Sequence, residues 1–251
     1  MEGLLVPTAA LGVLVAQFFL IVARLSLVVF LMPGLGEQAV TMRARVLILL
    51  ALSAAALTLT PMPYVSVTPF AGYLALIAGE VAIGFFLGAS LRLAIWLLSI
   101  VGTIIAQSIG LAQMLGVALE NEQQTIMSNI LTLAGVAVLL SANYHVQAYA
   151  SYLDLYNTVP VGGYGLIEPT MFMNAFFAGM NFAITLAWPF VTMGLVYNIS
   201  LGFINKAMPQ LMVAFVGAPF MVGAGLFLLS VSIVSLMVVW IDRVYTFLPW
   251  I

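Results

Sequence analysis

Residues 99–125, SIVGTIIAQSIGLAQMLGVALENEQQT, mark the point where a strongly apolar chain gives way to small and polar residues. Glycine recurs at Gly102, Gly110 and Gly116, and the stretch ends in the polar run 120–124. Closely spaced glycines suit a segment that bends or packs backbone against backbone, and glutamines suit one that meets water. We predict a loop or broken helix that lines a pathway. The alternative is a membrane helix that ends in a polar extramembrane loop.

The composition of the chain is that of a membrane protein. Hydrophobic residues make up 65% of the 251 residues and charged residues only 6%, whereas about a quarter of the residues in a soluble domain are charged. Apolar runs of about 20 residues, long enough to cross a bilayer, follow one another along the sequence and leave no room for a separate soluble domain. We therefore predict an all-α membrane protein built of long apolar helices and helical hairpins.

The same composition excludes several classes of function. With six Lys and Arg and a net charge of −2, the chain lacks the basic surface that binding to nucleic acid requires. The sequence contains no cysteine, which excludes disulfides, thiolate catalysis and cysteine-based metal sites. The first residues carry no basic region and no evident cleavage site, so we expect an uncleaved first span.

Apolar runs and breaks divide the chain into predicted elements. The predicted spans cover residues 11–32, 46–59, 70–98, 126–142, 171–201 and 211–240. Turns and connectors rich in proline and glycine are predicted at residues 33–37, 61–69, 158–165 and 208–210. Tyrosines at helical spacing in residues 144–156 predict a helix at the bilayer–water boundary. Residues 242–251 are expected to form a short interfacial tail.

Three charged residues interrupt the predicted spans. Arg24 lies in the first span, where an arginine costs about 2.5–3.5 kcal/mol and usually faces protein or water; alternatively, it snorkels from a tilted helix. Glu80 and Arg92 are twelve residues apart in the third span. They are therefore separated by about 18 Å along a helix and cannot pair, so each is expected to meet a partner on another helix or another chain. Between them, Gly84 and Gly88 form a GxxxG step that permits close helix approach.

The catalytic repertoire of the sequence is small. His145 is its one histidine, so neither a His-based metal site nor a HExxH protease can be built, and we expect a structural imidazole rather than the partner of a catalytic serine. Glu120 and Glu122 are expected to be solvated. Met114 either seals a passage, because methionine adapts to irregular gaps, or packs as an ordinary helix residue. We predict no enzyme activity, no catalytic residue, no metal and no cofactor.

The order of these features along the chain is more specific than any one motif. In order they are Arg24, the Pro33-Gly34 turn, Arg43-x-Arg45, Gly79-Glu80 in GEVAIGFFLGASLRLAIW, Gly102 with Gln107, Asn143-x-His145, VPVG at 159–162, and NKAMPQL at 205–211 before VAFVGAPF. Over essentially its whole length the chain resembles the FliR-type subunit of the bacterial flagellar and type III protein export gate, whose injectisome counterpart is the SctT-type subunit. The corner and central motifs favour the flagellar branch.

The resemblance implies an architecture and a set of partners. The subunit would fuse the folds of its FliP-type and FliQ-type partners, with residues 1–170 FliP-like and residues 171–251 a FliQ-like helical hairpin. It would assemble with them in the inner membrane and flagellar basal body, surrounded in part by lipid, to export unfolded proteins. An FlhB-type switch protein at the entrance and an FlhA-type component are further implied partners. Energy would come from proton motive force and a separate ATPase.

The resemblance also implies roles for particular residues. The central loop, about residues 102–125, would plug the closed pore, and we assign to that plug Gln107, Gly110, Leu111, Gln113, Met114, Leu115 and Gly116. We assign inter-subunit or buried polar contacts to Arg24, Glu80, Arg92, Lys206 and Gln210. The alternative function is a stand-alone secondary transporter with a midplane site around Glu80 and Arg92. An intramembrane enzyme is a third and more distant class.

Overall fold

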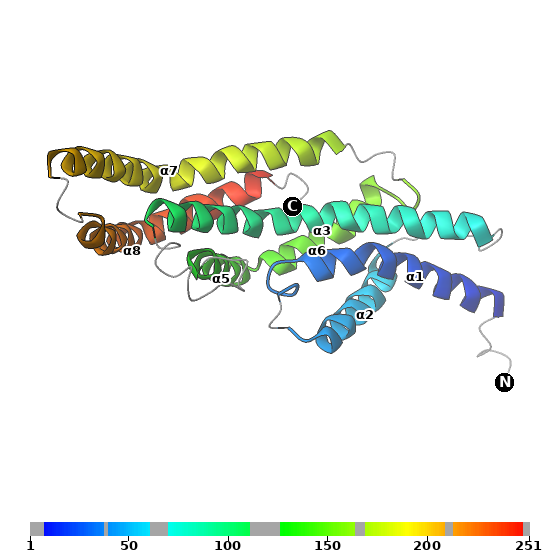
Figure 1. Cartoon of the computed structure of the whole chain (residues 1–251). Coiled ribbons are helices and arrows are strands. Elements are labelled where there is room, and N and C mark those ends of the chain that lie inside the picture. Colours follow the sequence, from blue (N-terminus) through cyan, green and yellow to red (C-terminus); the bar gives the residue numbers. More distant parts are fainter. Residues whose placement is uncertain are drawn as a thin grey trace. The chain divides into compact units, whose positions relative to one another are not determined.

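The computed structural model describes residues 8–37, 40–60, 70–110, 126–163, 169–208 and 213–247, and within these ranges it is entirely helical (Figure 1). The helices are α1 (Thr8–Leu31), α2 (Met42–Leu59), α3 (Phe70–Ser108), α5 (Ile126–Ser141), α6 (Tyr144–Thr158), α7 (Pro169–Ala207) and α8 (Val213–Phe247). The predicted all-α fold is confirmed.

The helices fall into two compact units, each made of segments that are separate in the sequence. The first unit comprises Met1–Leu93, Leu139–Asn174 and Leu248–Ile251, and the second comprises Ala94–Val138 and Ala175–Phe247. Helices α3, α5 and α7 contribute residues to both units. The boundary after residue 170 that the resemblance implies stays a prediction.

In the first unit, α1 runs parallel to the beginning of α3. The hydroxyl of Tyr73 donates to the carbonyl of Ala16 (2.9 Å), and further along both helices Gly88 of α3 lies against the carbonyl of Leu27 in α1. Residue numbers therefore rise together along the contact, and α2 supplies the return path between the two helices (Figure 1). The two helices need α2 because parallel neighbours cannot be joined by a short turn.

In the second unit, the end of α3 packs against α5, α7 and α8. Trp240 of α8 is almost fully buried, and its indole N–H donates to the carbonyl of Ala94 (3.3 Å). Gly179 of α7 lies against the side chain of Leu97, and Gly135 of α5 lies against that of Leu98. Large apolar side chains on α3 thus fill space that small residues leave open on the surrounding helices.

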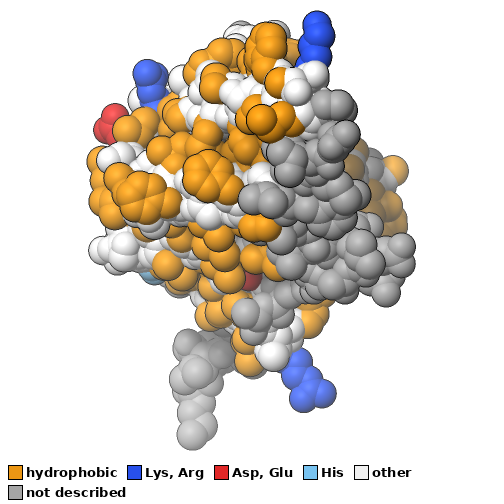
Figure 2. Space-filling model, turned by 60° about the vertical axis from the view of Figure 1, so that its left-hand side comes forward, with side chains coloured by type: hydrophobic (Ala, Val, Ile, Leu, Met, Phe, Trp, Pro, Cys, Tyr) orange, Lys and Arg blue, Asp and Glu red, His pale blue; other side chains and the backbone are white. Residues whose placement is uncertain are grey.

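The helices have the length and apolarity that membrane spans need. Five of them qualify as candidate spans, and α5 with α6 forms a sixth if this pair, bent by 65°, counts as one. The bend occurs at Asn143, which has a left-handed backbone conformation (φ +55°). Figure 2 shows a face covered mostly by hydrophobic side chains, with charged side chains mainly at its margins. The predicted multi-span membrane protein is confirmed.

Three predicted helix ends are too early, and the first is that of α7, which was predicted to end at residue 201 and continues to Ala207. Helix α3 continues ten residues past the predicted end at residue 98, to Ser108, because Thr103 and Ser108 bond their hydroxyls to the carbonyls of Ser99 and Ile104 and so remain compatible with a helix. Helix α8, predicted to end at residue 240, continues to Phe247, so the charged residues 242 and 243, which were assigned to a short interfacial tail, belong to the helix.

Candidate functional site

A buried ion pair in the first unit joins α1 to α3. The two helices approach closely here, since a Cβ on Gly84 would lie 2.0 Å from the carbonyl oxygen of Arg24, and one on Gly88 would lie 2.5 Å from that of Leu27. The close approach predicted from the GxxxG step is therefore confirmed. It places the guanidinium of Arg24 against the carboxylate of Glu80, and both residues are fully buried. Arg24 faces protein and does not snorkel.

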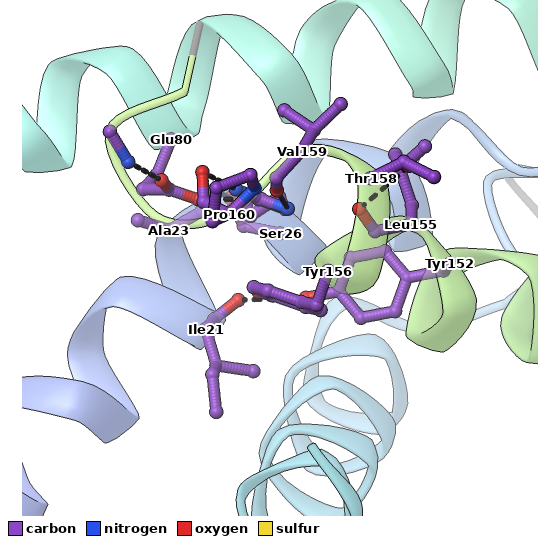
Figure 3. A network of polar contacts seen from close by, with 12 residues as sticks. Ile21, Ala23, Ser26, Glu80, Tyr152, Leu155, Tyr156, Thr158, Val159 and Pro160 are labelled. Atoms are coloured by element: carbon purple, nitrogen blue, oxygen red, sulfur yellow. Dashed lines mark hydrogen bonds and ion pairs between the residues drawn. The ribbon is translucent and has the colours of Figure 1, made fainter. Parts of the chain in front are cut away.

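The remaining hydrogen bonds of this pair go to the turn that follows α6 (Figure 3). Arg24 Nη1 donates to the carbonyl of Val159 (3.0 Å) and Nη2 to that of Pro160 (3.5 Å), while the backbone N–H of Gly162 donates to Glu80 Oε1 (3.1 Å). Gly162 has φ +80°, which glycine adopts without strain. A buried ion pair is tolerated only when its other polar atoms are also satisfied, and the turn satisfies them.

Two buried tyrosines complete the Arg24–Glu80 cluster. The guanidinium carbon of Arg24 lies 4.1 Å from the ring centroid of Tyr156, a cation–π contact. The hydroxyl of Tyr156 is hydrogen-bonded to that of Tyr152 (2.8 Å), and both rings are buried (Figure 3). The hydroxyls of both tyrosines therefore have partners inside the protein, and the prediction that this helix lies at the bilayer–water boundary stays a prediction.

A second ion pair in the first unit fixes the connector between α1 and α2. Arg92 Nη1 of α3 donates to Glu37 Oε1 (2.5 Å), with 22% and 28% of the two side chains exposed. Arg45, at the start of α2, donates to the backbone carbonyl of Glu37. Glu80 and Arg92 thus have separate partners, as their spacing predicted, and each partner belongs to this same chain rather than to a neighbouring one.

In the second unit, α3 ends at a glycine just before the central stretch. Gly110 has φ +75°, and its N–H donates to the carbonyl of Gln107 (3.2 Å), as in a left-handed helix cap. A Cβ on Gly110 would have nothing within 4 Å, so backbone conformation rather than lack of space requires glycine here. The side chain of Gln107 is exposed, whereas Ile109 is buried. The buried side chain of Ile109 therefore anchors the chain just before residues 111–125.

The surroundings of this helix end are unusually close. A Cβ on Gly194 of α7 would lie 2.6 Å from the carbonyl oxygen of Ser108, and one on Gly225 of α8 would lie 2.4 Å from Ile109 Cγ2. After residues 111–125, the backbone of Ser128 in α5 lies against Gly102 of α3, where a Cβ on Gly102 would be 2.5 Å from Ser128 Cα. The described segments on both sides of residues 111–125 are thus tightly packed.

The structure separates the predicted site residues into distinct groups. Arg24 and Glu80 meet in one cluster, Arg92 belongs to a second, and Lys206 is exposed in the last turn of α7. The predicted plug residues Leu111, Gln113, Met114, Leu115 and Gly116, together with Gln210, lie outside the described residues. Within the described ranges, no group of three or more His, Asp or Glu is placed to hold a metal.

Sequence reasoning missed two parts of these sites. The turn at residues 159–162 was predicted only as a break, although its carbonyls and N–H complete the coordination of Arg24 and Glu80. Opposite charges in two apolar runs were the available signal for the pair itself. The glycines of α7 and α8 that lie against Ser108 and Ile109 carry no such signal, because their contacts join distant parts of the sequence.

Comparison with known proteins identifies the family. The family described as "Bacterial export proteins, family 1" matches residues 15–246. The chain belongs to this family. It is similar to the flagellar biosynthetic protein FliR of Caulobacter vibrioides, at 29% identity over 89% of this chain and 91% of the relative. The FliR proteins of Aquifex aeolicus (28% identity; 88% and 84% covered) and Escherichia coli (27%; 79% and 77%) are also similar.

The order of the motifs predicted this family, and the match confirms the prediction. The match includes α2 through α7 completely and nearly all of α8, so both the Arg24–Glu80 cluster and the end of α3 lie inside it. Membership of an export family, together with five or six candidate spans, makes it a multi-pass membrane protein of bacterial protein export.

Proposed function

We propose that this chain is a core subunit of the flagellar protein export gate in the bacterial inner membrane and basal body. With FliP-type and FliQ-type partners it forms the channel through which unfolded flagellar proteins leave the cell, and FlhB-type and FlhA-type components assemble around it. The chain acts by forming and closing a passage, without enzymatic chemistry. The observation that carries the proposal is the family match over residues 15–246, with relatives that are themselves named flagellar biosynthetic proteins.

The exposed surface supports a subunit that works inside an assembly. Large apolar side chains are strongly exposed on several helices: Leu47 of α2 (68%), Phe203 of α7 (71%) and Phe227 of α8 (71%). Lipid is able to cover such side chains. In a channel built from several subunits, however, some of these exposed helix faces must contact the other subunits. Partner subunits are therefore part of the proposal.

The central stretch is proposed to plug the closed channel. A plug has to leave and re-enter the channel repeatedly, while the residues that attach it to the rest of the protein must stay in place. The rigid anchors at Ile109 and Ser128, which are both buried, support this division of roles. Between the anchors, the sequence LAQMLGV at 111–117 combines apolar, small and methionine side chains that can seal a gap without a fixed packing arrangement.

The stand-alone transporter is less well supported. Its midplane site required Glu80 and Arg92 to act together, whereas Glu80 is paired with Arg24 and Arg92 with Glu37. The carboxylate of Glu80 is also bonded to the N–H of Gly162. Because Glu80 is fully buried and each of its carboxylate oxygens already has a partner within the protein, this group is poorly placed to bind a transported ion or substrate.

Co-purification tests the proposed assembly. The tagged full chain is expressed together with the membrane proteins encoded beside it, purified in mild detergent and analysed by native mass spectrometry. We expect a stable heteromeric complex that contains FliP-like and FliQ-like subunits. A monodisperse particle that contains only this chain would contradict the proposal and favour the transporter.

Deletion of residues 111–118 tests the plug. We expect the complex to assemble with unchanged composition, because the anchors at Ile109 and Ser128 remain, and the membrane to become leaky to small ions. Ion leak is measured in intact cells, or after reconstitution of the purified complex in liposomes. As a control, Gly223→Ala changes a site with nothing within 4 Å of the added Cβ and is expected to leave the membrane tight. An unchanged leak in the deletion variant, with normal assembly, would rule out the plug.

A further inference from the structure

One exposed face of α7 carries hydrogen-bonding groups that the described residues leave without partners. The face is formed by Asn181, Thr185, Trp188 and Thr192, called here the α7 seam, which recur at spacings of four, three and four residues. Asn181, Thr185 and Trp188 are exposed. The opposite face of the same helix is packed inside the second unit, where Ala183, Ala187 and Phe190 are almost completely buried. The seam therefore points directly away from the core of its own unit.

The first unused group is the side-chain amide of Asn181. Within the described part of the chain, Asn181 is engaged only through its backbone carbonyl, which accepts from the hydroxyl of Thr185 (2.8 Å). An amide that faces hydrocarbon without a partner is strongly disfavoured, because it loses its hydrogen bonds to water and nothing replaces them. Residues 169–205 contain no Asp, Glu, Lys or Arg, so no charged side chain of this segment hydrates the surroundings of Asn181.

The second unused group is the backbone carbonyl of Thr185. In a helix this carbonyl accepts from the N–H four residues later, but that residue is Pro189, which has no N–H. The hydroxyl of Thr192 bonds instead to the carbonyls of Trp188 (3.1 Å) and Pro189 (2.9 Å), so it does not replace the missing donor. The freed carbonyl lies between the exposed residues Thr185 and Pro189, about one turn from Asn181.

The pattern fits a second helix better than lipid or water. Lipid supplies neither donor nor acceptor. A water-filled passage favours a broad polar face, whereas this seam is narrow and is flanked by exposed Ile184 (46%) on one side and exposed Val196 (64%) on the other. A narrow line of polar groups between large apolar residues, at the spacing of a helix–helix contact, is typical of polar contacts between membrane helices.

We propose that the α7 seam is the docking site for a membrane helix of another subunit, one that carries an amide or hydroxyl side chain at the level of Asn181 and Thr185. That side chain donates to the carbonyl of Thr185 and exchanges a hydrogen bond with the amide of Asn181, while Trp188 packs along the docked helix. The subunit belongs to the complex described above, so this inference rests on the proposed function for the identity of the assembly.

Cysteine labelling tests what covers the seam. The chain contains no cysteine, so Thr185→Cys introduces a single reactive thiol into it. In membranes that contain the chain alone, we expect this thiol to react with a lipid-soluble maleimide. In membranes with the complete complex, we expect at least tenfold slower labelling by the lipid-soluble reagent and none by a charged, membrane-impermeant one. Fast labelling of the complex by the lipid-soluble reagent would show that lipid covers the seam, and labelling by the charged reagent would show a water-filled passage; either result overturns the proposal.

A photo-cross-link identifies the occupant. Benzophenone maleimide attached at Thr185→Cys before assembly is expected to form an adduct whose mass corresponds to this chain plus one different subunit. An adduct between two copies of this chain would overturn the assignment to another subunit.

Substitution of the amide tests the hydrogen bond itself. Asn181→Leu is expected to reduce recovery of the complex about tenfold, because hydrogen bonds between membrane helices contribute about 1–2 kcal/mol in model peptides. Membrane insertion of the chain should be unaffected, since leucine favours a membrane helix. The matched control is Ile184→Leu, an apolar exchange on the flank of the seam, which should leave recovery unchanged. Undiminished recovery of the Asn181→Leu complex would overturn the seam and leave the proposed function intact, whereas failure of the unaltered chain to form any complex would overturn the proposed function.

Discussion

The two units of this protein hold apolar helices together by different means. Among the described residues, the first unit contains almost all of the buried polar and charged side chains: Gln17, Arg24, Ser53, Thr60, Glu80 and Ser90. The second unit contains Ser128 in this class. Both units bring helices together through glycines, at Gly84 and Gly88 in the first, but the second relies on such contacts, at Gly102, Gly194 and Gly225, with little buried polar support.

The difference shows two ways in which a membrane protein can specify which helices pack together when hydrophobicity does not distinguish between them. In a membrane, apolar side chains gain little from leaving lipid for protein, so helix contacts depend on close packing and on polar groups that need partners. The Arg24–Glu80 cluster uses the second means, because an alternative arrangement would leave a charge unpaired. The glycines use the first, because they let backbone meet backbone at a distance that any side chain would prevent.

The largest expected effect is the loss of one charge from the buried pair. Glu80→Leu and Arg24→Met should each destabilise the protein by about 3–5 kcal/mol, because each leaves the other charge buried without a partner. The double variant Arg24→Met/Glu80→Leu should be more stable than either single variant. The measurement is thermal unfolding of the detergent-purified complex, followed by size-exclusion chromatography. A double variant no more stable than the singles would show that hydrogen bonds to the turn at 159–162, rather than the ion pair, hold this unit.

An intermediate effect is expected where glycine permits backbone contact in the second unit. Gly102→Ala should cost about 1–3 kcal/mol, the usual penalty of overpacking, because the added methyl group would lie 2.5 Å from Ser128 Cα and cannot be accommodated by a side-chain rotation. The control is Gly223→Ala in α8, where nothing lies within 4 Å; alanine there should be neutral or stabilising by up to about 1 kcal/mol. Equal melting temperatures for the two variants would contradict the role assigned to Gly102.

The smallest expected effect is at the partly exposed pair of Arg92 and Glu37. A double-mutant cycle with Arg92→Gln and Glu37→Gln should give a coupling of about 1 kcal/mol or less, since exposed and half-exposed pairs are weak. The coupling should fall further in about 1 M salt, which screens partly exposed charges, whereas the coupling between Arg24 and Glu80 should not change. A salt-insensitive coupling between Arg92 and Glu37 would place this pair in the same class as the buried one.

Much of the fold could be read from the sequence because its cause is local. The spans, the turn at residues 33–37, the glycine-permitted approach of α3 to another helix and the separate partners of Glu80 and Arg92 all follow from hydropathy, turn residues and helix geometry. The helix ends were less accurate: small polar residues between 99 and 108 were read as a break, but their hydroxyls bond to the preceding turn and the helix continues.

The sequence by itself determined that this is an all-helical membrane protein of an export family, because composition, apolar run length and motif order belong to the chain whatever its packing. Only the tertiary structure decided which groups meet. It paired Arg24 with Glu80 and closed that pair with Val159 and Gly162, it buried tyrosines of α6, and it turned the Asn181 face outward. Hydropathy records whether a residue avoids water, but not its neighbours, and in a chain this apolar every face of a helix avoids water equally. The choice of neighbours is made by the few groups that need a hydrogen bond and by the glycines that leave room for one helix to approach another.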